Sequence, residues 1–102
     1  MNQFELYCVL FRVLDHVWDQ SHDPELGAYL SGANPFLFTD DGSAVPSVYQ
    51  QFCRIVDRPV AVADSYREAG RYIASLHNAA AEKAFSETDE AKWMEFVSGA
   101  VR

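Results

Sequence analysis

The sequence predicts an all-α fold, a compact bundle of four to five helices. Apolar residues recur at three- and four-residue steps along most of the chain, and turn-forming residues separate these segments. No alternating strand pattern of useful length competes with them. At 102 residues, with 49% hydrophobic and 14% aromatic residues, the chain can bury one core, so we expect a single helical domain over 1–102. Amphipathic helices joined by short turns are typical of a bundle.

The first predicted helix covers residues 3–20 and has the widest apolar surface. The aromatic and aliphatic residues that recur at helical spacing on it are Phe4, Tyr7, Phe11, Leu14 and Trp18. Leu6, Leu10, Val13 and Val17 fill the neighbouring stripe. Because so little of its circumference is polar, we expect this helix to be covered from more than one side and to lie at the centre of the bundle.

A short second helix is predicted over 24–31. Ser21 or Asp23 is expected to be its N-cap, and Pro24 suits the first helical turn. Residues 31–45 form one irregular loop, in which turn residues surround a short apolar triplet.

Three more helices are predicted in the second half of the chain. Their ranges are 46–57, 62–82 and 88–101. The first of them starts near Pro46 and ends where Pro59 disfavours helical backbone in the residue before it. The middle one is expected to continue through residues 79–81, three alanines of high helix propensity. The last is expected to have Ser86 or Thr88 as its N-cap.

The formal net charge of −7 is unevenly distributed. Residues 1–50 contain seven acidic residues and a single base, Arg12, whereas residues 51–102 contain eight acids and seven bases. An acidic surface repels phosphate and attracts basic proteins, so we expect a protein partner and no nucleic-acid partner. No apolar run reaches the roughly 18 residues of a membrane span, and a basic signal-peptide start is lacking. We therefore expect a cytoplasmic protein with no membrane partner.

The two cysteines, Cys8 and Cys53, both fall in apolar helical segments. This favours two reduced, buried thiols that pack as small hydrophobic side chains. A single disulfide between them, which requires an oxidising compartment, is the alternative.

The candidate metal ligands are His16, Asp19, His22 and Asp23, which cluster around the end of the first predicted helix. Two imidazoles and a carboxylate suit zinc or another transition metal. The H-E-x-x-H spacing is absent, however, and surface histidines near a helix C-terminus are explained by the helix dipole. We expect no metal, no cofactor and no catalytic residues; a metal-binding protein or enzyme based on these four residues is the alternative.

The one basic concentration consists of Arg54, Arg58, Arg67 and Arg71. They form two i, i+4 pairs on helices joined at Pro59, and four guanidinium groups on one surface can bind an anion. The nearby acids Asp57, Asp64 and Glu68 make internal ion pairing the favoured interpretation. A weak phosphate or nucleic-acid binder is the second alternative function.

The apolar triplet of the irregular loop is Phe36-Leu37-Phe38. We expect it to be tucked under the bundle; if exposed, it forms a partner-binding or self-association patch. The leading hypothesis is a non-enzymatic protein-interaction module that binds a protein partner or its own copy. Its candidate contact residues are Tyr29, Phe36, Leu37, Phe38, Asp40 and Asp41. In size and charge the chain resembles small acidic helical inhibitors such as bacterial immunity proteins, but the resemblance extends to no sequence motif.

Overall fold

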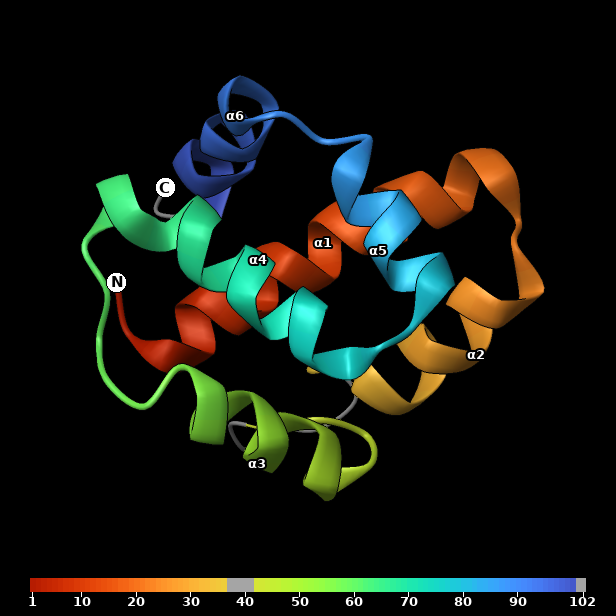
Figure 1. Cartoon of the computed structure of the whole chain (residues 1–102), viewed down its shortest axis with the longest axis horizontal. Coiled ribbons are helices and arrows are strands. Elements are labelled where there is room, and N and C mark those ends of the chain that lie inside the picture. Colours follow the sequence, from red (N-terminus) through yellow and green to blue (C-terminus); the bar gives the residue numbers. More distant parts are fainter. Residues whose placement is uncertain (37–41, 101–102) are drawn as a thin grey trace.

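A computed structural model of the chain describes residues 1–36 and 42–100 (Figure 1). These residues form six α-helices, one short 3₁₀ turn and no strand, which confirms the all-α fold with one helix more than predicted. The elements are α1 (Gln3–Ser21), α2 (Pro24–Ala33), α3 (Pro46–Ile55), η1 (Val62–Asp64), α4 (Ser65–Leu76), α5 (Ala79–Ser86) and α6 (Glu90–Ala100). None of these helices has the length and apolar content needed to cross a membrane.

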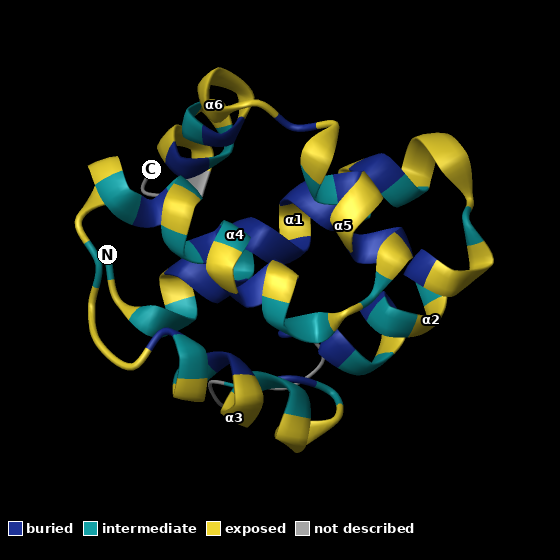
Figure 2. Cartoon of the chain, in the orientation of Figure 1, coloured by how far each residue is buried: buried dark blue, intermediate teal, exposed yellow. Residues whose placement is uncertain are grey.

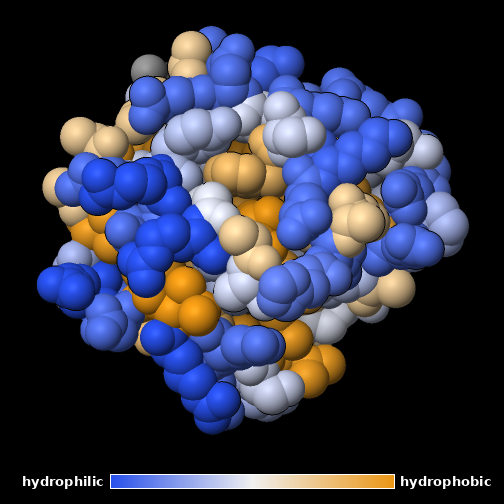
Figure 3. All heavy atoms as spheres, in the orientation of Figure 1, coloured by the Kyte–Doolittle hydropathy of each residue, from blue (hydrophilic) through white to orange (hydrophobic). Residues whose placement is uncertain are grey.

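Helix α1 is the central element, as its apolar pattern predicts. Asn2 and Glu5 form a capping box at its start: the Asn2 side chain accepts the Glu5 N–H, and the Glu5 carboxylate accepts the Asn2 N–H. Helices α2 to α6 all contact α1 (Figure 1), and Figure 2 shows the resulting buried residues along its length. They are Leu6, Tyr7, Val9, Leu10, Phe11, Val13, Leu14 and Val17. The face shown in Figure 3 is mostly hydrophilic, with hydrophobic residues exposed in places.

The single helix predicted over 62–82 is wrong, because this stretch contains η1, α4 and the first half of α5. His77 has the left-handed backbone conformation, with φ 49° and ψ 41°, which ends α4. The Asn78 side chain then accepts the Ala81 N–H at 3.2 Å and begins α5. The break turns the chain so that the alanines of α5 pack into the core, where Ala80, Ala81 and Ala84 are buried.

The helix caps agree only partly with prediction. Asp23 is the N-cap of α2, as expected, and its carboxylate accepts the Glu25 N–H at 2.9 Å. Neither Ser86 nor Thr88 caps α6: Asp89 accepts the Lys92 N–H at 2.8 Å. Ser86 is instead the last residue of α5, and the following turn moves the start of α6 beyond the predicted cap.

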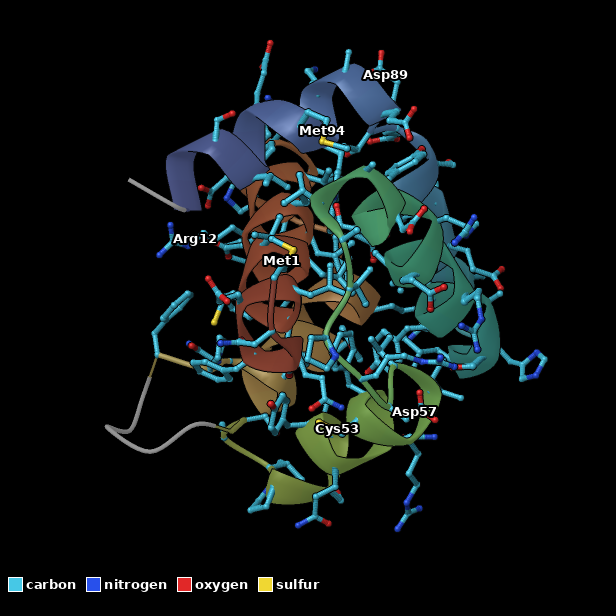
Figure 4. The ribbon with its side chains drawn as sticks, turned by 90° about the vertical axis from the view of Figure 1, so that its left-hand side faces the viewer. Met1, Arg12, Cys53, Asp57, Asp89 and Met94 are labelled. Atoms are coloured by element: carbon cyan, nitrogen blue, oxygen red, sulfur yellow. The ribbon has the colours of Figure 1, made fainter. Side chains whose placement is uncertain are left out.

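The cysteines do not form a disulfide, and both side chains are partly exposed. The prediction of two thiols outside a disulfide is confirmed, whereas their predicted burial is only partial. Cys53 lies on α3 (Figure 4), next in sequence to the buried Phe52.

Two aromatic clusters fill much of the core. In the first, the fully buried Phe52 ring packs edge-on against Tyr7 at 5.1 Å and Tyr72 at 4.9 Å between ring centroids, which joins α1, α3 and α4. In the second, the fully buried Trp93 of α6 lies 6.1 Å from Phe85, and its indole N–H donates to the Ser65 hydroxyl at 2.8 Å.

A close approach between α1 and α2 depends on Gly27. A Cβ added there would lie 2.7 Å from Nε1 of Trp18, closer than real Cβ contacts. Glycine-to-alanine changes within helices normally stabilise by about 0.5–1 kcal/mol. We expect Gly27→Ala to destabilise the protein instead, by about 1–3 kcal/mol, because Trp18 must move. Urea unfolding of the variant measures this change.

Gly99 provides the matched control, because it is also helical and a Cβ there meets nothing within 4 Å. Gly99→Ala is expected to leave stability unchanged or to raise it by up to about 1 kcal/mol. If both variants were equally stabilised, the Trp18 ring would not be fixed against α2.

Candidate functional site

The irregular loop has a closed base. Val45 N–H donates to Gly32 O at 2.8 Å, and Ala44 N–H donates to Asn34 O at 2.9 Å. These two hydrogen bonds join the end of α2 to the residues that precede α3. Within it, the Asn34 side chain accepts the Phe36 N–H at 2.8 Å and fixes the first turn.

Both ends of the loop are also attached to neighbouring helices. The Tyr7 hydroxyl of α1 donates to Ala33 O at the end of α2. The buried Ser43 hydroxyl donates to Val45 O and accepts the Tyr49 N–H at 3.0 Å, in the first turn of α3. The residues that flank the loop are therefore held by α1 and α3.

Phe36 is the exposed aromatic residue of this site. Half of its surface is accessible, and its ring edge contacts Phe11, with 5.6 Å between centroids. The Arg12 guanidinium carbon lies 5.1 Å from the Phe36 ring centroid, a cation–π contact. Arg12 projects outward from α1 (Figure 4). The expected burial of the triplet is thus wrong for Phe36, while Leu37 and Phe38 lie outside the described residues, as do Asp40 and Asp41.

Tyr29 does not share this surface with Phe36. Its hydroxyl lies 2.9 Å from the Tyr72 hydroxyl, between α2 and α4. Burial, followed by the neighbouring Tyr72, raises the pKa of Tyr29 well above its ordinary value. Burial likewise raises the pKa of Tyr72. Tyr29 is therefore part of a part-buried, hydrogen-bonded tyrosine pair. It lines a small cavity with Phe11, the residue that Phe36 contacts.

The exposed face of α1 adjoins Phe36 and carries mostly charged side chains. Its exposed members are Glu5, Arg12, His16 and Asp19. Asp15 is half-buried beside them, and its pKa is raised by burial and by the neighbouring Asp19. Sequence reasoning overlooked the role of Arg12, although a signal was available: Arg12 is the single base among the first fifty residues.

The candidate metal ligands are engaged in other contacts. The His16 ring packs against Phe96, with 5.7 Å between centroids, and His22 takes a left-handed backbone conformation and packs against Trp18. Asp23 caps α2. Within residues 1–36 and 42–100, no three His, Cys, Asp or Glu side chains gather in an arrangement that would hold a metal ion.

Three of the four arginines form the predicted ion pairs. The nitrogen–oxygen distances are 3.4 Å for Arg58–Asp57, 3.4 Å for Arg67–Asp64 and 2.5 Å for Arg71–Glu68. Arg54 is exposed on α3. The expectation of internal pairing is confirmed for the three arginines around the α3–α4 connection.

Comparison of the chain with protein-family models, curated proteins and solved structures gives no match.

Proposed function

We propose that this chain is a non-enzymatic protein that binds a basic partner protein through the surface formed by Phe36 and the exposed face of α1. One observation carries the proposal: a half-exposed phenylalanine is held between Phe11 and Arg12 at the base of a closed loop. An inhibitor of a basic protein in the cytoplasm is one form that this function can take.

The chemistry of Phe36 suits an interface anchor. Aromatic residues and arginine are enriched at protein interfaces, where a central apolar side chain enters a pocket of the partner. Contacts with Phe11 and Arg12 restrict the ring, and the two hydrogen bonds at the loop base restrict the backbone. A restricted anchor loses less conformational entropy on binding than a mobile one.

The acidic charge of the surface around Phe36 favours a partner with a basic surface. Residues 1–50 contain seven acids, and Glu5 and Asp19 are exposed on α1. The one base in this half, Arg12, lies over the Phe36 ring. A basic surface placed here would be attracted electrostatically, and its association would weaken as salt is added.

The test compares how much basic protein is captured by three immobilised proteins: the wild type, Phe36→Ser and Val62→Ser. Val62 is the matched control because it is apolar and 44% exposed, close to the 50% of Phe36, but lies in η1. We expect the wild type and Val62→Ser to capture the same basic protein, and Phe36→Ser to capture at least tenfold less. Circular dichroism should show the same helical signal for all three.

Equal capture by Phe36→Ser and the wild type would contradict the proposal, as would binding that is insensitive to salt. Loss of the helical signal in Phe36→Ser would show that the ring is needed for folding, and the surface would then lose its proposed anchor.

A further inference from the structure

A charged recess lies on the side of the molecule where segment 56–61 connects α3 to η1 and α4 (Figure 1). Its volume is about 310 Å³. The segment is held in place by the N-terminus: Val60 N–H donates to Met1 O at 2.8 Å, and the Gln3 side-chain amide donates to Val56 O at 2.6 Å. Met1 accordingly lies close to this segment (Figure 4). These two hydrogen bonds therefore hold segment 56–61, which forms one wall of the recess, in place.

Side chains of both charges line the recess. The charged residues that line it are Arg58, Arg67, Arg71, Asp57, Asp64 and Glu68. The three positive and three negative charges cancel formally. The lining is therefore matched to a ligand that carries charges of both signs.

One of the ion pairs is part of the wall. The Glu68 carboxylate is only 15% exposed and lies 2.5 Å from a guanidinium nitrogen of Arg71. Arg71 also donates to Ile55 O at 3.5 Å. These contacts fix Arg71 and Glu68 to each other and to the end of α3, so a ligand would not displace them.

The other two arginines are accessible. The Arg58 and Arg67 side chains are 82% and 70% exposed, and their ion pairs with Asp57 and Asp64 have nitrogen–oxygen distances of 3.4 Å. Exposed pairs of this length contribute little to stability. Each guanidinium carries five N–H donors in a fork that matches a carboxylate. Arg58 has Asp57 as its acidic neighbour, and Arg67 lies near Asp64 and, at 3.9 Å, near Glu68, so donors remain on both arginines.

We propose that this recess binds a small zwitterion of the α-amino acid class. Arg58 and Arg67 hold the carboxylate, and Asp57 and Asp64 hold the ammonium group. A simple anion is a poorer fit, because its charge would lie close to these two aspartates. A zwitterion places each of its charges against an opposite one.

Size and apolar lining limit the side chain of the ligand. A volume of about 310 Å³ is large enough for an amino acid. Val56, Pro59 and Val60 form part of the wall. Figure 3 shows hydrophobic residues between hydrophilic ones in the region of α3 and α4. A short aliphatic side chain would pack against this part of the wall.

The test titrates three probes that share an isopropyl group into ¹⁵N-labelled protein and follows backbone amide shifts by NMR. L-valine carries both charged groups, isovalerate lacks the ammonium group and isobutylamine lacks the carboxylate. We expect saturable shifts at residues 57–68 with L-valine, and at least tenfold weaker binding of the other two probes.

Arg67→Gln is expected to weaken L-valine binding at least tenfold, whereas Arg54→Gln, at an exposed arginine outside the recess, should leave it unchanged. A thermal melt confirms that both variants are folded. Three results would overturn the proposal: L-valine shifts that do not saturate, isovalerate or inorganic phosphate binding as tightly as L-valine, or equal L-valine binding by the two variants.

Discussion

Replacing Trp93 with alanine is expected to lower the free energy of unfolding by about 3–5 kcal/mol. The side chain is 0% exposed and is the largest in the core, so its removal leaves a cavity between α4, α5 and α6. The indole N–H also donates to Ser65, whose hydroxyl in turn donates to Val62 O at 2.7 Å. The substitution therefore removes both the packing of α6 and a buried hydrogen bond that supports the start of α4. Urea unfolding followed by circular dichroism measures the loss.

Trp93→Phe separates these two contributions. Phenylalanine keeps an aromatic ring against Tyr66 and Phe85 but cannot donate to Ser65, so we expect a smaller loss of about 1–3 kcal/mol. Trp18 remains as a fluorescent probe in both variants. If Trp93→Ala unfolded within about 1 kcal/mol of the wild type, the second aromatic cluster would not contribute to the core as described.

Replacing Phe52 with alanine is expected to cost a similar amount, about 3–5 kcal/mol. Phe52 is fully buried and is the contact through which α3 packs against Tyr7 and Tyr72. It is the one fully buried residue of α3, so its removal should loosen this helix more than the others. Thermal and urea unfolding measure the global effect. Amide hydrogen exchange should show the largest loss of protection in α3.

Gln51→Ala is the control for Phe52→Ala, since Gln51 is the preceding residue of the same helix and is exposed. We expect a change within about 0.5 kcal/mol. A uniform loss of exchange protection across all helices in Phe52→Ala would show that α3 does not open separately from the rest of the bundle.

Phe52 also bears on the proposed interaction site. Helix α3 holds one end of the irregular loop through the Ser43 hydroxyl and the Tyr49 N–H. If α3 loosens, the loop base loses one of its two attachments, while the Tyr7 hydroxyl bond to Ala33 O keeps the other. Binding through Phe36 should then weaken through lost restriction of the loop, even though Phe52 lies in the core.

The sequence predicted α1 closely because its apolar signal is long and wide: apolar residues recur over five turns and leave only a narrow polar face. The prediction of a single helix over 62–82 failed because helix propensity is a local property, whereas the break between α4 and α5 depends on tertiary packing. His77 adopts a left-handed conformation that non-glycine residues rarely take. Packing of α5 against α1, together with the Asn78 cap, stabilises that conformation.

The candidate site was predicted in part for similar reasons. The position of Phe36 among turn residues indicated an unusual aromatic residue, and the structure exposes it. Tyr29 was grouped with Phe36 because the two residues are close in sequence. The direction of a helical side chain, however, depends on which elements pack against its helix. Here Tyr72, forty-three residues later, provides the hydroxyl partner. The cation–π contact of Arg12 with Phe36 likewise joins residues from separate elements and has no local sequence pattern.

The central position of α1 has a consequence for biosynthesis. Helix α1 is translated before the five helices that cover it, and α6 begins only at Glu90. At about 5–20 residues per second, the ribosome completes α6, the last of the covering helices, several seconds after α1. During that interval the nascent chain presents α1, with its eight core residues, without the helices that bury them. The surface that later becomes the core is therefore the one most in need of protection by chaperones or by the ribosome itself while the chain is incomplete.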